Sequence, residues 1–256
     1  MKSKNNLWVP ILGAILLVLT VLINYLSDYF RLGGYTNKEV SDMYPTLFTP
    51  APITFSIWGI IYLSLIIFSI LSFKKNNEEL IKDIGPFYIL SFVLNIAWII
   101  TWHFNVIGVS LFIIFLLMMT LFIIQSRCAD NNKEIGHAIF GIYSGWITVA
   151  TIASIFTVLT KEIGRFHESK LEILLAVAMI IIATMVTWYM TVLDRNPFYG
   201  VSVFWGMLGI VINQFDMYNG KYDLVISAAV VSMIIILISI GIDIRDCRKC
   251  FKRVLN

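Results

Sequence analysis

Three groups of aromatic and polar side chains recur at helical spacing and could form a binding site for a flat ligand. The groups are Phe55, Trp58 and Tyr62; Asn95, Trp98 and Trp102; and Tyr143, Trp146 and Ala150. Within each group the spacing is i, i+3, i+7, so its members share one face of a helix. Aromatic faces stack on planar rings, while indole N–H and phenol O–H groups bind polar edges. We therefore predict an interhelical pocket for a flat, largely apolar ligand.

Catalytic and metal-binding patterns are not found in the sequence. There is no nucleophile–base pair, phosphate-binding glycine loop, zinc-protease motif or dinucleotide fingerprint, so we predict no catalytic residues and no enzymatic activity. The three histidines, His103, His137 and His167, are scattered over span ends and loops, which argues against a shared metal site. An alternative reading makes His103 an axial ligand of haem.

The three cysteines are Cys128, Cys247 and Cys250. The Cys247-x-x-Cys250 pair has no second Cys or His pair nearby, and a structural zinc site needs four ligands. We interpret the pair as thiols close to the membrane, with palmitoylation as an alternative refinement.

The composition indicates that membrane-spanning helices must position these side chains. Of the 256 residues, 59% are apolar and 14% are charged, whereas soluble domains have about 45–50% apolar and about 25% charged residues. The mean hydropathy is +0.84. The apolar runs are long and continuous, unlike the short alternating strands of membrane β-barrels. The predicted fold class is an all-α polytopic membrane helix bundle.

Eight segments have about the length of 20 residues that a spanning helix needs. They are Trp8–Leu26, Ile53–Phe73, Pro86–His103, Ile107–Gln125, Ala138–Leu159, Leu171–Leu193, Phe198–Phe215 and Leu224–Ile242. The first is too long for a signal peptide and has no cleavage site, so we expect a retained helix. The seventh is short and contains Asn213.

The charge distribution predicts the orientation. With eight spans and the N-terminus inside, 13 of the 19 Lys and Arg residues fall in inside segments and 6 in outside loops. Because cytoplasmic loops are enriched in Lys and Arg, we expect both termini to be cytoplasmic and the protein to lie in the cell membrane. The basic tail after Ile244 fits an anionic inner leaflet, so nucleic acid is not an expected partner.

The longest hydrophilic stretch, Ser27–Pro52, joins the first two spans. It contains Gly33, Gly34, Pro45, Pro50 and Pro52, and residues of these types mark turns and loops. We predict an irregular loop.

This loop and the three aromatic groups resemble the TspO/MBR family (tryptophan-rich sensory protein / translocator protein). The loop contains Tyr44-Pro45-Thr46-Leu47, similar to the family's Tyr-Pro-Ser-Leu element, followed by Phe48-Thr49-Pro50-Ala51-Pro52. The next helices contain Phe55, Trp58 and Tyr62, then Asn95-Ile96-Ala97-Trp98, then Tyr143-Ser144-Gly145-Trp146. Two positions depart from the family: Ile142 replaces a usual Pro and Ser154 replaces a usual Asn.

The resemblance covers roughly residues 7–160 and implies a five-helix membrane domain over residues 1–160. Residues 161–256 would add three helices and the basic tail. It also implies a porphyrin, haem or other tetrapyrrole as the ligand, and for some members a sterol. The loop would then be a lid over the pocket, which adds Tyr44, Pro45, Leu47, Pro50 and Pro52 to the site. Expected partners are the lipid bilayer, a hydrophobic small molecule and a second copy in a homodimer.

Other readings stay open. In one alternative, Asn95 binds no ligand and only bonds a neighbouring helix. In another, aromatic residues at span ends only anchor the protein at the membrane interface; these are Trp8, Tyr88, Trp102, Trp188 and Tyr189. The three extra helices favour a secondary transporter or the permease subunit of a larger complex. Porphyrin breakdown by pocket tryptophans is a third hypothesis.

Overall fold

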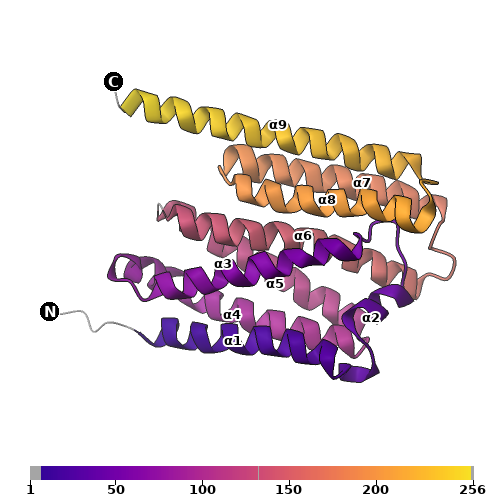
Figure 1. The fold of residues 1–256 in the computed structure, drawn as a ribbon, viewed down its shortest axis with the longest axis horizontal. Helices are drawn as coiled ribbons and strands as arrows, with labels where there is room; N and C mark the ends of the chain where they lie inside the picture. The colour runs from indigo at the N-terminus through magenta and orange to yellow at the C-terminus, as the bar shows by residue number, and fades with distance from the viewer. Residues whose placement is uncertain (1–6, 132, 255–256) are drawn as a thin grey trace. The chain divides into compact units, whose positions relative to one another are not determined.

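The computed structural model describes the backbone of residues 7–131 and 133–254, and the side chains as far as Arg245. Throughout these ranges the regular elements are helical (Figure 1). The helices are α1 (Trp8–Tyr29), α2 (Asn37–Met43), α3 (Ile57–Ser72), α4 (Glu78–His103), α5 (Ile107–Asp130), α6 (Glu134–Glu162), α7 (Lys170–Trp188), α8 (Pro197–Tyr218) and α9 (Asp223–Val254). Shorter helical turns are η1 (Leu32–Gly34), η2 (Pro52–Ser56), η3 (Lys75–Asn77) and the π-helical η4 (Tyr189–Leu193).

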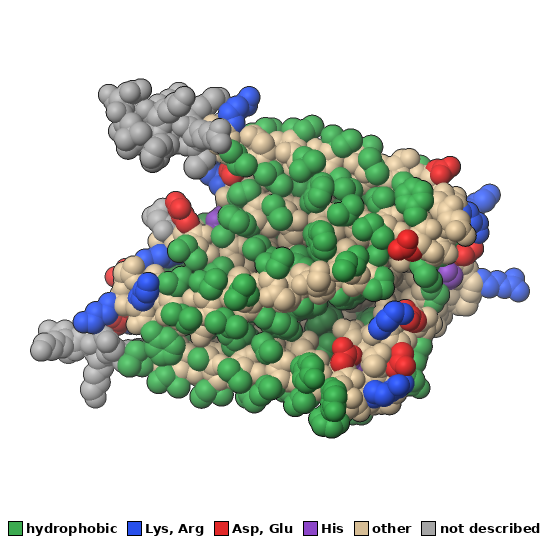
Figure 2. Space-filling view, in the orientation of Figure 1, with side chains coloured by type: hydrophobic (Ala, Val, Ile, Leu, Met, Phe, Trp, Pro, Cys, Tyr) green, Lys and Arg blue, Asp and Glu red, His purple; other side chains and the backbone are tan. Residues whose placement is uncertain are grey.

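Eight helical segments in the described ranges are long and apolar enough to cross a membrane. Figure 2 shows hydrophobic side chains along the helices and Lys, Arg, Asp and Glu side chains mostly at their ends. Such helices satisfy their own backbone groups, which lipid requires. The predicted fold class and the eight spans are confirmed, including the short seventh span, which becomes the 22-residue α8.

The chain forms two compact units, which do not follow simple chain order. Unit 1 comprises Met1–Tyr44 and Trp58–Phe140, and unit 2 comprises Pro45–Ile57 and Gly141–Asn256. The segment of residues 45–57, called the strap below, therefore belongs with helices that lie far away in the sequence. The family resemblance predicts a division between residues 1–160 and residues 161–256. That division concerns sequence similarity rather than spatial packing, and it stays a prediction.

Unit 1 is built on close contacts of α4 with α1 and α5. A Cβ on Gly13 of α1 would collide with the ring of Tyr88 on α4, and one on Gly85 of α4 would lie 3.1 Å from the Val9 side chain. Small residues let membrane helices approach in this way. Phe68, Tyr88 and Phe140 form an edge-to-face core beside them.

Unit 2 places α9 against both α7 and α8. Thr184 on α7 donates to the Ser232 hydroxyl on α9 over 2.6 Å. Between α6 and α8, the hydroxyls of Thr148 and Tyr199 lie 2.8 Å apart. A Cβ on Gly145 would lie 2.7 Å from the Tyr199 carbonyl oxygen. Small side chains and paired hydroxyls therefore hold this unit together.

The prediction of an irregular loop over Ser27–Pro52 is wrong for residues 37–43, which form α2. Thr36 accepts a hydrogen bond from the Glu39 N–H, and the Glu39 carboxylate accepts one from the Thr36 N–H. This capping box starts the helix. The glycines and prolines that suggested a loop all lie outside residues 37–43.

Candidate functional site

The aromatic groups of the second and third spans meet in unit 1. The Trp58 ring stacks on Trp98 with a centroid distance of 5.9 Å and an interplanar angle of 24°. It also stacks on Tyr62 at 5.5 Å and 28°. These three rings are called the Trp58 cluster below, and the Trp58 ring lies within 28° of parallel to each of the other two. One residue from each of these two predicted groups, Trp58 and Trp98, therefore lies against the other, and the binding role of the groups stays a prediction.

Trp98 carries a hydrogen-bond donor that is not used. Its side chain is 6% exposed, and its Nε1 has no hydrogen-bond partner in the part of the chain that the structure describes. Buried polar groups normally have a partner, because leaving one unpaired costs about 1–3 kcal/mol. This N–H is therefore a candidate contact for a ligand.

The other polar members of these stripes have structural partners. Asn24 donates to the Oδ1 of fully buried Asn95 over 3.1 Å. Asn95 therefore joins α1 to α4, as expected if it bonds a neighbouring helix. Trp102 is buried and donates to the Asn37 carbonyl of α2 at 3.4 Å. The interpretation of Trp102 and Tyr88 as exposed membrane anchors is wrong, because both are buried. Trp8, Trp188 and Tyr189 are exposed.

In unit 2 the backbone of the strap is bound by side chains of the later helices. The Leu47 N–H donates to Glu172 Oε1 of α7 over 2.7 Å, and Gln214 Nε2 of α8 donates to the Leu47 carbonyl over 2.7 Å. The Leu47 side chain is fully buried. Both polar groups of an irregular residue are therefore satisfied inside the protein, as non-helical backbone at membrane depth requires.

Two further contacts fix the remainder of the strap. The Ala51 N–H donates to the Gly209 carbonyl over 2.9 Å, and Trp205 Nε1 donates to the Thr54 carbonyl over 2.9 Å. A Cβ on Gly209 would collide with the Thr54 methyl group and would lie 2.9 Å from the Pro50 Cβ. The strap thus follows α8 at a distance that only glycine permits.

The strap also places two aromatic rings. Phe48 stacks on Phe156 of α6 with a centroid distance of 5.4 Å, and Phe55 packs edge-to-face on Trp146 of α6 at 5.6 Å and 83°. Trp146 is 2% exposed, and its Nε1, like that of Trp98, lacks a hydrogen-bond partner among the described residues. Unit 2 therefore has its own aromatic pair, Phe55–Trp146, with an unused indole donor.

Charged groups surround the Glu172 contact. The second oxygen of Glu172, Oε2, accepts from the Glu168 N–H over 2.7 Å and lies 3.3 Å from His167 Nδ1. Glu168 in turn binds Lys221 Nζ over 2.7 Å. The hydrogen bond from Lys221 lowers the pKa of Glu168, and the same bond raises the pKa of Lys221.

The predicted site residues therefore fall in two places. Phe55 lies in the 3-10 turn η2, two residues before α3 begins. It belongs to unit 2, whereas Trp58 and Tyr62 belong to unit 1. Tyr44 donates to Asn105 Oδ1 in unit 1 over 3.0 Å. Asn95, Trp98 and Trp102 lie on α4 in unit 1. Unit 2 contains Pro45, Leu47, Pro50 and Pro52 in the strap, and Tyr143, Trp146 and Ala150 on α6.

His103 has no ring nitrogen left for a metal. Its Nδ1 lies 2.9 Å from the Ile99 carbonyl oxygen, and its Nε2 lies 3.2 Å from Asp28 Oδ1. The axial-ligand alternative thus does not fit this arrangement. Over the described residues, no group of three or more His, Cys, Asp and Glu side chains could hold a metal ion. Cys128 is buried, whereas the side chains of Cys247 and Cys250 lie outside the described residues.

Sequence reasoning missed the residues that bind the strap, namely Glu172, Trp205, Gly209 and Gln214. Glu172 lies three residues after Ser169 at the start of a span. The pattern Ser-x-x-Glu is an ordinary helix start, so it does not indicate a site residue. Gln214 adjoins Asn213 in the short seventh span, and neither was assigned to the candidate site. Their role depends on a segment more than a hundred residues away, so local spacing carries no signal for it.

The eight spans and the buried polar contacts between them define a multi-pass α-helical membrane protein. A family model for TSPO-like proteins matches residues 10–242, and the chain belongs to this family. The match includes α7, α8 and much of α9, whereas the motifs that carry the sequence resemblance lie within residues 7–160. Comparisons with curated proteins and with solved structures found no match.

Proposed function

We propose that the protein is a membrane-embedded sensor or translocator that binds a tetrapyrrole or another flat, largely apolar ligand. The observation that carries this proposal is the Trp58 cluster, in which stacked rings adjoin the buried, unused N–H of Trp98. Porphyrin or haem is proposed as the ligand, and no separate cofactor is required.

The chemistry of the cluster suits such a ligand. Nearly parallel indole and phenol faces can exchange their contacts with one another for contacts with a planar ring system. An acceptor atom on the ligand would also recover the hydrogen bond that the Trp98 N–H lacks. Binding would then require a shift of the Trp58 ring, because the rings now stack on one another.

The strap is proposed to take part through Phe55. Its backbone is bound at Leu47, Ala51 and Thr54, which leaves the Phe55–Trp146 pair at its end. The Phe55 side chain is 37% exposed. The pair therefore offers a second aromatic surface, next to the unused indole N–H of Trp146. We propose that the strap positions this surface rather than opening freely as a lid.

The proposed location is the cell membrane with both termini in the cytoplasm, on the basis of the distribution of Lys and Arg. Tags at the two ends, probed by protease in sealed spheroplasts and after lysis, test this orientation. Cleavage of both tags only after lysis supports it, whereas cleavage of either tag in intact spheroplasts contradicts it.

Titration of the purified protein with protoporphyrin, followed by tryptophan fluorescence, tests the binding proposal. Saturable quenching is expected, with weaker affinity in Trp58→Phe and Trp98→Phe. Trp188→Phe is the matched control, because Trp188 lies on α7 outside both aromatic groups. Absence of saturable quenching, or equal affinity in all three variants, would sink the proposal.

A further inference from the structure

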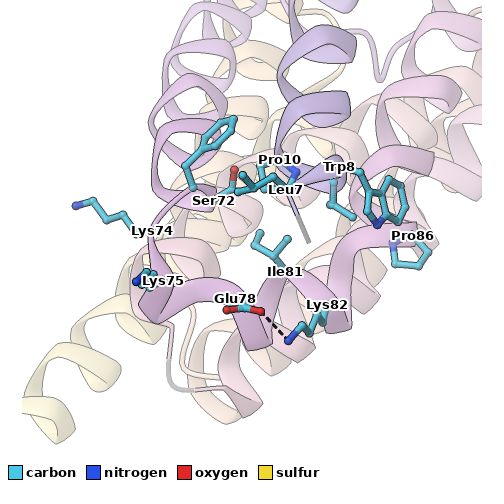
Figure 3. Close-up of a pocket in the computed structure, with 12 residues that line it drawn as sticks. Leu7, Trp8, Pro10, Ser72, Lys74, Lys75, Glu78, Ile81, Lys82 and Pro86 are labelled. Carbon is cyan, nitrogen blue, oxygen red and sulfur yellow. Dashed lines mark ion pairs between the residues drawn. The ribbon is translucent and has the colours of Figure 1, made fainter. Parts of the chain in front are cut away.

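A small cavity with basic residues at its rim lies in unit 1 where α1 and α4 begin. Its volume is about 140 Å³. Figure 3 shows Leu7, Trp8 and Pro10 of the α1 start facing Ile81 and Pro86 of α4 across it. Lys74, Lys75 and Lys82 also line the cavity. It therefore combines an apolar floor with cationic groups.

The charge at this cavity is positive. Lys82 Nζ forms an ion pair with Glu78 Oε1 at 2.8 Å, drawn as a dashed line in Figure 3. Lys74 and Lys75 are exposed, and neither has an ion-pair partner among the residues that the structure describes. Figure 3 shows the Lys74 side chain extended outward from the apolar floor. Two ammonium groups are thus available to an anion.

The start of α1 adds to this attraction. Its N-cap residue, Leu7, makes no side-chain cap, and its first turn contains no acidic residue. The first N–H groups of a helix have no partner inside the helix and carry the positive end of its dipole. In α4, by contrast, Glu78 and Glu79 occupy the first turn and offset this effect. The α1 start is therefore the more favourable side for an anion.

We propose that this cavity binds the phosphate of an anionic phospholipid, such as phosphatidylglycerol. Both α1 and α4 are membrane spans, so the cavity where they begin lies at the membrane surface, where lipid phosphates are. Basic pockets between spanning helices bind lipid headgroups in this way. The apolar floor favours a lipid over free phosphate, because only a lipid has a glycerol and acyl region to place against Trp8, Ile81 and Pro86.

The lipids that the purified protein retains show directly whether it prefers an anionic phospholipid. The full-length protein, purified in detergent with an equal mixture of phosphatidylglycerol and phosphatidylcholine, is analysed by native mass spectrometry. We expect preferential retention of phosphatidylglycerol, and a loss of that preference by roughly 10- to 30-fold in Lys74→Gln/Lys75→Gln, the size expected for two lysines near a membrane surface. Glu78→Gln should increase the preference, because it releases Lys82.

The matched control is Lys161→Gln/Lys170→Gln, which removes the same charge at the ends of α6 and α7 and should keep the wild-type preference. Helical circular dichroism verifies that each variant folds. Equal retention of both lipids by the wild type, or an equal loss of preference in the control, would overturn the proposal. So would thermal stabilisation by inorganic phosphate that matches that by phosphatidylglycerol, since it would indicate a site for free anions.

Discussion

The Leu47 N–H donates to Glu172 Oε1 over 2.7 Å, and this bond joins the strap to a helix 125 positions later in the chain. Glu172 also accepts from the Glu168 N–H over 2.7 Å. One buried carboxylate thus satisfies a backbone donor of the strap and one of the turn before α7. The position of Phe55, farther along the strap, depends in part on this contact.

Replacement of Glu172 by Ala should destabilise the protein. It would leave the buried Leu47 N–H unpaired, at about 1–3 kcal/mol, and would remove the partner of the part-buried Glu168 N–H. Glu172→Gln should cost less, because its amide oxygen still accepts one of the two bonds. Unfolding in detergent, followed by circular dichroism, measures both variants. Glu162→Ala, an exposed acid at the end of α6, is the control, and the account fails if it costs as much as Glu172→Ala.

Gly209→Ala should also destabilise unit 2. The added Cβ would collide with Thr54 and lie 2.9 Å from the Pro50 Cβ, and overpacking of this kind costs about 1–3 kcal/mol. Gly108→Ala is the control, since a Cβ there meets nothing within 4 Å. The measurement is the thermal unfolding midpoint of each variant. Equal midpoints for the two variants would mean that α8 and the strap do not pack as described.

Stability should depend on pH through Glu168 and Lys221. The hydrogen bond from Lys221 lowers the pKa of Glu168 below its usual value of 4.5, so the contribution of Glu168 is present above that value and is lost as the pH falls through the lowered pKa. The pKa of Lys221 is raised, so its contribution is present below the usual lysine pKa and is lost only as the pH rises through the raised one.

Unfolding midpoints of the wild type and Lys221→Gln across acidic and neutral pH check this dependence. We expect the wild type to be the more stable near neutral pH and the two midpoints to converge as the pH falls below 4.5. Lys170→Gln serves as a charge-matched control. A difference between wild type and Lys221→Gln that persists unchanged at acidic pH would contradict the assignment of the ion pair.

The sequence predicted the spans because long apolar runs have few alternatives to a membrane helix. It also predicted the meeting of Trp58 and Trp98, since helical spacing places such residues on one face. It did not predict that Phe55 would leave this face. Pro52 opens a 3-10 turn before α3, so the α-helical spacing assumed for Phe55 does not apply.

The binding of the strap could not be predicted for a different reason. The strap has no regular secondary structure over Leu47–Ala51, and its backbone partners, Glu172 and Gln214, come from helices with no local pattern that refers to it. Helix α2, by contrast, could have been predicted, because the Thr36-x-x-Glu39 capping box is present in the sequence. The glycines and prolines around it favoured the prediction of a loop instead.

The central claim is that a flat ligand binds at the aromatic groups. The most direct measurement is photo-crosslinking with protoporphyrin bound to the protein, followed by mass spectrometry of the labelled peptides. The account predicts labels on peptides that contain Trp58 and Trp98, with competition by unlabelled porphyrin. Unit 2 provides a rival location, an apolar groove of about 580 Å³ between α7 and α9 that includes Met185 and Trp188. Labels confined to that groove would contradict the claim.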